Sequence, residues 1–374
     1  MRLGIDGRSL ESNPAGIGRY FLELAKCLDT LLPDAHFVLY TQNPLKMNPI
    51  SERWVHRHEP SKTLRKVKGI AWLEWFAGRL CKQDALDVFW APATFWPSFL
   101  PKRIKVVSSV HDLNHVVVPE TMPSQTLNAY RLFFAHDVRR ADAVVATSHA
   151  TAARLFANNQ VKAFRVVLPG VSANFHPRTP EIIKKARIAY GLGEDPYILA
   201  LSTLEPRKNL VNLLHAFTRL KRNGELAAYK LVLVGGSGWK MEALDAILQD
   251  EKGQVVRCGY VPDEDLPALY SGASLFVFPS IYEGFGIPVL EAAACGTPIL
   301  ATDIPEIREA AQGRGIFVGT GIGDIESGLQ MAIQNVEEGI SATIQVTGSD
   351  WQTQAKLLVE ALLFANSKQE GWTK

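Results

Sequence analysis

The chain has 374 residues, of which 47% are hydrophobic and 21% are charged, which is typical of a water-soluble protein with two domain-sized cores. No apolar run reaches the roughly 18 residues that a membrane span requires. The four cysteines show no paired spacing, which excludes a zinc-ribbon domain and a disulfide-rich secreted scaffold.

The net charge of +2 is unevenly distributed along the chain. Residues 1–170 hold 22 Lys and Arg against 14 Asp and Glu, and the remainder carries a net −6. The basic first half predicts contact with something anionic. We expect no nucleic-acid partner, because no binding motif for one is recognisable. The N-terminus leads into a predicted strand without a signal peptide, so we expect a cytoplasmic location.

Short β-branched and aromatic runs alternate with amphipathic segments along the chain, as in doubly wound α/β domains with parallel sheets. The first series of predicted strands is Leu3–Ile5, His36–Tyr40, Asp87–Trp90, Lys105–Val110, Ala143–Thr147 and Arg165–Leu168. The second series is Tyr197–Leu201, Lys230–Val234, Gln254–Cys258, Ser274–Phe278, Pro298–Ala301 and Gly315–Val318. Two such series predict two Rossmann-like domains, divided within the turn-rich segment 169–180.

A glycine-containing loop, residues 13–20 (NPAGIGRY), opens the predicted helix Arg19–Leu32. Gly16 and Gly18 let the backbone approach a ligand closely, and a helix N-terminus favours a phosphate. Glycines before a helix are common, so this loop alone does not identify a ligand.

Apolar residues recur at helical spacing between Lys62 and Lys82, which predicts one amphipathic helix there. Two interpretations stay open. The first is a core helix with a solvated basic face. The second is an interfacial helix that binds anionic lipid headgroups and lipid-linked acceptors. In the second case the contacting residues are Lys62, Arg65, Lys66, Lys68, Trp72 and Trp75.

His111 follows the predicted strand Lys105–Val110. A titratable side chain at the carboxyl edge of a parallel strand can reach a ligand bound there. The alternative is a turn cap, in which Asp112 orients the imidazole or the turn.

Two adjacent cations, Arg207 and Lys208, lie in the segment TLEPRKN after the strand Tyr197–Leu201. A forked guanidinium and a point charge suit a diphosphate, whose developing negative charge must be stabilised when it leaves. We recognise no Asp-x-Asp pair positioned to hold a divalent cation with a sugar nucleotide, so we expect a metal-free site without a cofactor. The alternative is a solvated basic turn.

Two later loops also follow predicted strands. Gly235 begins the segment GGSG, where the glycines line a nucleotide pocket or only form a tight turn. Tyr260 and Val261 follow the strand Gln254–Cys258 and lie where a base could bind.

Residues 278–297 (FPSIYEGFGIPVLEAAACGT) pass from a strand through a glycine loop into the predicted helix Val289–Cys295. Glu283 in the loop and Glu291 in the helix bracket the turn, and the amides of residues 285–287 point beyond the helix N-terminus. Carboxylates accept hydrogen bonds from vicinal hydroxyls, and free amides hold anions. The stretch therefore suits a sugar that carries a phosphate.

The Glu-x7-Glu spacing within YEGFGIPVLEA resembles the donor-site signature of the retaining family 4 glycosyltransferases, which have the GT-B fold. The resemblance implies an α/β protein with two Rossmann-like domains whose parallel sheets face across a deep cleft. It assigns acceptor binding to residues 1–172, nucleotide-sugar binding to residues 173–350, and a helix that crosses back to the N-terminal domain to residues 351–374.

The resemblance also implies roles for individual residues. Glu291 would hold the ribose diol and Glu283 the donor sugar, while His111 would bind the sugar beside the reacting bond. TLEPRKN looks like the phosphate-binding loop of this family, although Thr203 stands where an arginine is common; Arg207 then takes that role beside Lys208. The remaining donor-binding residues would be Gly16, Gly18, Gly235, Tyr260, Val261, Gly284, Phe285, Gly286 and Ile287.

Together with the following DIPE, these motifs resemble bacterial mannosyltransferases of surface-polysaccharide assembly (O-antigen, capsule or exopolysaccharide). This implies transfer of mannose from GDP-mannose to a lipid-linked oligosaccharide at the inner face of the cytoplasmic membrane. UDP- or dTDP-sugars of glucose, N-acetylglucosamine or rhamnose stay open as donors, as does a non-catalytic sugar-nucleotide-binding protein. A nicotinamide-dependent oxidoreductase is disfavoured, because no GxGxxG joins the first strand to the first helix.

Overall fold

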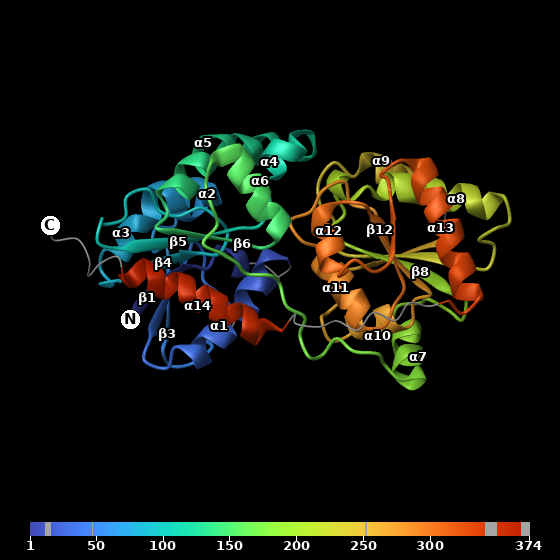
Figure 1. Ribbon diagram of the computed structural model, residues 1–374, viewed down its shortest axis with the longest axis horizontal. Coiled ribbons are helices and arrows are strands. Elements are labelled where there is room, and N and C mark those ends of the chain that lie inside the picture. The colour runs from blue at the N-terminus through green and yellow to red at the C-terminus, as the bar shows by residue number, and fades with distance from the viewer. Residues whose placement is uncertain (12–15, 47, 251–252, 341–349, 368–374) are drawn as a thin grey trace. The chain divides into compact units, whose positions relative to one another are not determined.

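The computed structural model describes residues 1–11, 16–46, 48–250, 253–340 and 350–367. These residues form two compact units (Figure 1). The first comprises Met1–His115, Ser124–Gly170 and the described residues from 350 onward; the second comprises Val116–Pro123 and the described residues from Val171 to 340. The boundary at Gly170 compares with the expected one at residue 172. Parts of the segments expected at 13–20, 173–350 and 351–374 lie outside the described residues.

The first unit is built on seven parallel strands in the order β3-β2-β1-β4-β5-β6-β7. The strands are β1 (Arg2–Asp6), β2 (His36–Thr41), β3 (Trp54–His58), β4 (Val88–Ala91), β5 (Lys105–Val110), β6 (Ala143–Ala146) and β7 (Arg165–Val166). Alternate residues of a strand enter different cores: Val88 and Trp90 pack on one face of the sheet, and Phe89 and Ala91 on the other. Both faces are therefore covered, as parallel sheets require.

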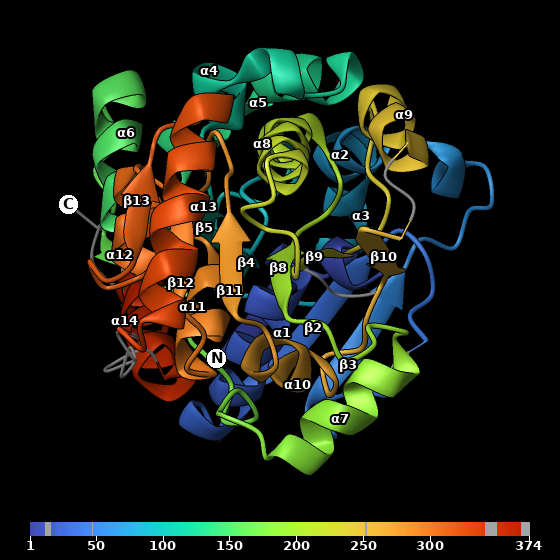
Figure 2. The same ribbon diagram turned by 90° about the vertical axis from the view of Figure 1, so that its right-hand side faces the viewer.

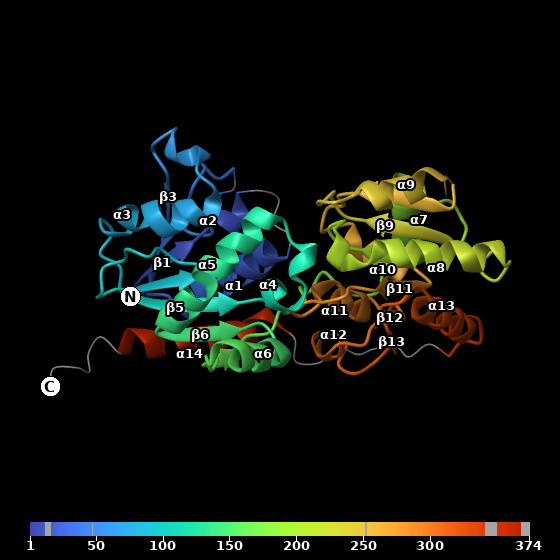
Figure 3. The same ribbon diagram turned by 90° about the horizontal axis from the view of Figure 1, so that it is seen from above.

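The final helix of the chain packs on the first unit, beside the first helix (Figures 1 and 3). The helices of this unit are α1 (Ile17–Leu31), α2 (Gly69–Trp72), α3 (Gly78–Cys81), α5 (Ser124–Arg140), α6 (His149–Asn159) and α14 (Trp351–Ser367). The short α4 (Asn114–Val117) begins in this unit and ends in the second. Gln354 of α14 accepts a hydrogen bond from the amide of Leu168 at 2.8 Å, which fixes the helix against the end of the sheet.

The second unit is built on six parallel strands in the order β10-β9-β8-β11-β12-β13 (Figure 2). They are β8 (Tyr197–Leu201), β9 (Lys230–Val234), β10 (Val255–Gly259), β11 (Leu275–Phe278), β12 (Ile299–Thr302) and β13 (Ile316–Val318). The helices are α7 (Pro180–Ala189), α8 (Leu210–Arg222), α9 (Glu242–Asp250), α10 (Leu266–Ser271), α11 (Ile287–Ala294), α12 (Pro305–Ala310) and α13 (Ile322–Glu337). The prediction of two Rossmann-like domains with parallel sheets is confirmed.

One strand escaped prediction. Strand β3, with the sequence WVHRH, lies at the edge of the first sheet, and most of its side chains are exposed or half-buried. It therefore lacks the apolar run by which the buried strands of a parallel sheet are recognised.

The continuous helix expected from Lys62 to Lys82 is wrong in its first third. Residues Leu64–Lys66 form a 3-10 turn, the backbone of Val67 and Lys68 is extended, and helical backbone begins only at Gly69. The side-chain nitrogen Nε2 of Gln42 donates to the carbonyls of Leu64, Arg65 and Val67 at 3.1, 2.9 and 2.5 Å. A tertiary contact thus engages the carbonyls that a longer helix would have used.

Candidate functional site

Three charged side chains meet at the carboxyl edge of the second sheet. Arg207 and Lys208 follow β8, and Glu283 follows β11. One carboxylate oxygen of Glu283 accepts a hydrogen bond from Arg207 Nη1 at 2.8 Å, and the other accepts from Lys208 Nζ at 2.5 Å. All three side chains are largely buried, with exposed fractions of 14%, 12% and 10% for Arg207, Lys208 and Glu283. We call these three residues the charged cluster.

The charged cluster perturbs its own protonation equilibria. Burial alone raises the pKa of Glu283, but the charges of Arg207 and Lys208 outweigh it and hold that pKa at about 2. Burial and the neighbouring Arg207 lower the pKa of Lys208, and Glu283 opposes them. The cluster therefore keeps an ionised acid against two cations in a largely buried site.

A second acid, Glu205, holds Arg207 from the other side. Its carboxylate oxygen Oε1 accepts a hydrogen bond from Nε of Arg207 at 3.0 Å and forms an ion pair with Nη2 at 2.7 Å. Nη1 donates also to the carbonyl of Tyr282 at 2.8 Å, and the amide of Ile281 donates to the Arg207 carbonyl at 2.9 Å. No role was predicted for Glu205, although an acid two residues before the arginine was a usable signal.

The loop after β11 delivers backbone amides beside the charged cluster. Gly286 caps α11 with φ of 112°, a conformation that favours glycine. Among the described residues, the amides of Phe285, Gly286 and Ile287 have no hydrogen-bond acceptor. Phe285 is buried, and Gly284 is half-buried in the same turn. This arrangement fits the predicted role of the amides as donors to a ligand.

Glu291 lies in α11 and is only 2% exposed. It accepts a hydrogen bond from the hydroxyl of Tyr270, in α10, at 3.0 Å. Tyr270 itself had no sequence signal, because a tyrosine in an apolar helix is usually part of the core. That Glu291 binds a ribose stays a prediction.

The other predicted donor-binding residues of this unit differ in exposure. Thr203 and Tyr260 are exposed, and Val261 is buried. Gly235 has φ of 134°, and a Cβ built on it would lie 1.9 Å from the carbonyl oxygen of Ser202. Close backbone packing therefore accounts for this glycine, whatever it binds.

In the first unit, the imidazole of His111 is held between a carbonyl and an aromatic ring. Its Nε2 lies 2.5 Å from the carbonyl oxygen of Pro92, and the ring packs edge-on against Tyr20 with centroids 4.9 Å apart. Because a carbonyl only accepts, Nε2 carries the proton. Burial lowers the pKa of His111, which favours the neutral ring and leaves Nδ1 as an acceptor.

The glycine loop of the first unit is described from residue 16 onward. Gly16 caps α1 with φ of 51°, and a Cβ built on it would meet no atom within 4 Å. Gly18 is buried in the first turn of α1. Their predicted contact with donor phosphates stays a prediction.

The residues expected to contact an acceptor or membrane divide into two groups. Lys62, Lys66 and Lys68 are exposed, and Trp75 is 52% exposed. The prediction that Trp72 contacts an acceptor or membrane is wrong, because its side chain is fully buried.

Glu59 explains both the burial of Trp72 and the position of Arg65. Its carboxylate accepts a hydrogen bond from the indole nitrogen of Trp72 at 2.8 Å, and its backbone carbonyl accepts one from Arg65 Nε at 2.6 Å.

Among the described residues, no helix combines the length and hydropathy needed to cross a bilayer.

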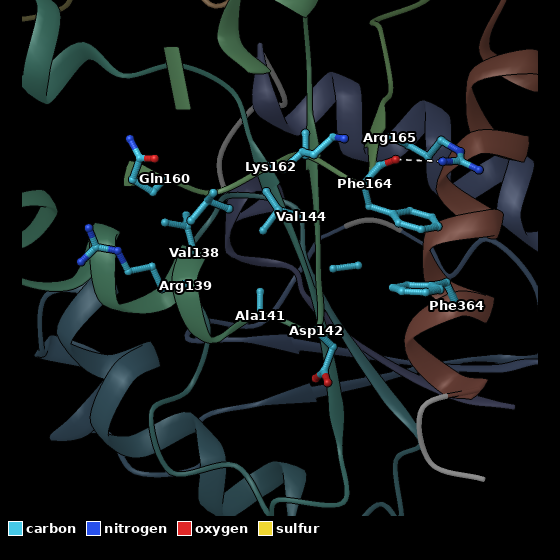
Figure 4. A pocket seen from close by; sticks show the side chains of 13 residues that line it. Val138, Arg139, Ala141, Asp142, Val144, Gln160, Lys162, Phe164, Arg165 and Phe364 are labelled. Carbon is cyan, nitrogen blue, oxygen red and sulfur yellow. Dashed lines mark hydrogen bonds between the residues drawn. The ribbon is translucent and has the colours of Figure 1, made fainter. Parts of the chain in front are cut away.

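A cavity of about 680 Å³ lies at the amino edge of the first sheet, where β6 and β7 begin (Figure 4). His111 follows β5 at the carboxyl edge of the same sheet. Figure 4 shows the rings of Phe164 and Phe364 stacked beside the cavity. Their centroids are 4.3 Å apart. None of the predicted site residues lines this cavity.

The sequence contains one Asp-x-Asp spacing, at Asp263 and Asp265, before α10. In the structure Asp265 accepts a hydrogen bond from the hydroxyl of Tyr190 at 2.6 Å. Within the described ranges, no group of three His, Cys, Asp or Glu side chains is arranged to hold a metal ion.

Two family models match the chain. The model described as glycosyl transferases group 1 matches residues 180–338, and the model described as glycosyltransferase family 4 matches residues 14–175. The O-antigen chain mannosyltransferase B of Escherichia coli is 31% identical over 223 residues, which are 58% of this chain and 58% of that protein. A GDP-mannose-dependent alpha-(1-6)-phosphatidylinositol monomannoside mannosyltransferase of Mycolicibacterium smegmatis is 35% identical over 142 residues, 36% of each chain. The chain thus spans less than two thirds of each relative.

Among solved structures, sucrose-phosphate synthase from Thermosynechococcus elongatus is similar with a TM-score of 0.70 at 16% sequence identity. The match covers 99% of this chain and 97% of that one. At this identity the likeness shows the fold alone.

Proposed function

The chain belongs to the family 4 (group 1) glycosyltransferases, and we propose that it transfers mannose from GDP-mannose to a lipid-linked oligosaccharide in bacterial surface-polysaccharide synthesis. The observation that carries the proposal is the charged cluster, which sets two buried cations at the carboxyl edge of the second sheet. The donor and the acceptor class are supported by the names of the two mannosyltransferase relatives.

We propose that the second unit holds the donor. Arg207 and Lys208 would stabilise the negative charge that develops on the departing diphosphate, without a metal ion. Glu283 and the amides of residues 285–287 would bind the sugar, and Glu291 the ribose. On the first unit, the Nδ1 lone pair of His111 would accept a hydrogen bond from a sugar hydroxyl.

The proposed reaction retains the configuration at the anomeric carbon. The bond from that carbon to the diphosphate oxygen breaks, and a bond to the acceptor oxygen forms on the same face of the sugar. The acceptor's hydroxyl proton passes to the departing phosphate. This route assigns no protein carboxylate as a nucleophile, unlike the double displacement of retaining glycosidases.

A thermal-shift screen of sugar nucleotides tests the donor. We expect GDP-mannose to raise Tm more than UDP-glucose, UDP-N-acetylglucosamine or dTDP-rhamnose, because a ligand bound only by the folded state stabilises it. GDP release should then require a polyprenyl-diphosphate-linked oligosaccharide and should be unchanged by EDTA.

Each contrary result of this test removes one part of the proposal. A larger shift with another nucleotide would reject the mannose donor, and inhibition by EDTA that magnesium reverses would reject the metal-free reaction. Nucleotide binding without release on any acceptor would favour a non-catalytic binding protein.

We also propose that the basic segment 62–68 of the first unit, which contains Lys62, Arg65, Lys66 and Lys68, binds the inner face of the cytoplasmic membrane. The double variant Lys62→Gln/Lys66→Gln should bind phosphatidylglycerol-containing vesicles at least tenfold more weakly, since each basic residue near an anionic surface contributes about 1 kcal/mol. The matched control is Lys184→Gln/Lys185→Gln, which removes two exposed lysines from α7 of the second unit. Equal binding by the two variants in vesicle sedimentation would reject the membrane contact. The basic residues would then form only a solvated face.

A further inference from the structure

The charged cluster has a property that the proposed function does not require. The acid assigned to the sugar, Glu283, is bonded to both cations assigned to the diphosphate. It uses both carboxylate oxygens, one for each cation, so it presents to Arg207 and Lys208 the bidentate pattern that a phosphate group would present.

The hydrogen-bonding capacity of Nη1 of Arg207 limits how a diphosphate oxygen can bind to this nitrogen. Nη1 carries two hydrogens, and their acceptors are the carbonyl of Tyr282 and the carboxylate of Glu283, each at 2.8 Å. A phosphate oxygen that bonds to Nη1 must displace one of these two. The carbonyl belongs to the backbone of the loop, whereas the carboxylate can move by side-chain rotation, so Glu283 is the group displaced.

We propose that Glu283 competes with the diphosphate for Arg207 and Lys208. Diphosphate binding then releases the Glu283 carboxylate, which accepts hydrogen bonds from the hydroxyls of the donor sugar. This inference rests on the proposed function and adds to it a basis for discrimination. A nucleoside diphosphate without a sugar displaces Glu283. The buried Glu283 carboxylate then lies beside the negatively charged diphosphate and has no hydrogen-bond donor. A sugar nucleotide supplies the hydroxyl donors that the displaced carboxylate then needs.

Glu205 provides a matched control on the same arginine. It contacts Nε and Nη2 of Arg207 but not Nη1, and among the described residues no hydrogen bond or ion pair joins it to Lys208. It therefore acts as a positioning residue that keeps Nη1 aimed at the site. Glu205→Gln removes the same charge as Glu283→Gln without removing the competitor.

The test is calorimetric titration of the full chain with GDP, inorganic pyrophosphate and GDP-mannose. We expect Glu283→Gln to bind GDP and pyrophosphate about tenfold more tightly than the wild type, and to lose most of the preference for GDP-mannose over GDP. Glu205→Gln should show no such gain. Circular dichroism confirms folding, and Glu283→Asp, whose shorter side chain reaches the cations less well, should show a smaller gain in the same direction.

Two results would overturn the competition. One is unchanged or weaker GDP binding in folded Glu283→Gln and Glu283→Asp, and the other is an equal gain in Glu205→Gln, which would indicate a general effect of net charge. In either case, weaker GDP binding by Lys208→Met would leave the proposed diphosphate site intact. If Lys208→Met binds GDP and pyrophosphate as the wild type does, both the proposed diphosphate site and the proposed competition by Glu283 are rejected.

Discussion

Replacing Lys208 with methionine should lower kcat/KM for sugar transfer by about 10²–10³-fold, the cost of removing one preorganised group that stabilises developing negative charge. Methionine retains the aliphatic volume of this largely buried side chain but removes its charge. The fold should survive, because Glu283 keeps its ion pair with Arg207. Steady-state rates of GDP release, measured beside urea unfolding, separate the loss of activity from any loss of stability.

The matched control for this variant is Lys184→Met, which removes an exposed lysine from α7 of the same unit. It should keep the wild-type rate. Full activity of folded Lys208→Met would remove the lysine from the reaction and return the segment 203–209 to a structural turn.

Replacing Gly235 with alanine should destabilise the second unit by several kcal/mol or prevent its folding. The new Cβ would lie 1.9 Å from the carbonyl oxygen and 2.7 Å from the carbonyl carbon of Ser202, and φ of 134° is unfavourable for any residue with a Cβ. Since the clash is between two backbone segments, side-chain rotation cannot relieve it.

The neighbouring Gly236→Ala provides the control, because a Cβ there would meet no atom within 4 Å. Its free energy of unfolding in urea should match the wild type within about 0.5 kcal/mol. A Gly235→Ala protein with wild-type stability but weakened GDP-mannose binding would show that the glycine serves the nucleotide pocket and not the packing.

The agreement between predicted and observed strands has a specific cause. Strands β8 and β9 have the predicted bounds, because each is a largely apolar run covered on both faces of a parallel sheet. Strand β5 also has the predicted bounds, although it includes two buried serines. The edge strand β3 lacks that run and was missed. The helix expected from Lys62 failed for a different reason: Gln42, some 20 residues earlier, bonds the carbonyls of its first turn.

The sequence by itself determined the two α/β domains, the family resemblance and the charged residues of the proposed donor site, since each depends on short runs of neighbouring residues. Only the tertiary structure decided which charges meet. Glu283 lies 75 residues from Lys208, and their ion pair exists because β8 and β11 are adjacent parallel strands whose carboxyl ends share one edge. The burial of Trp72 against Glu59 has the same origin, because the partner of a side chain depends on the packing of elements and not on local spacing.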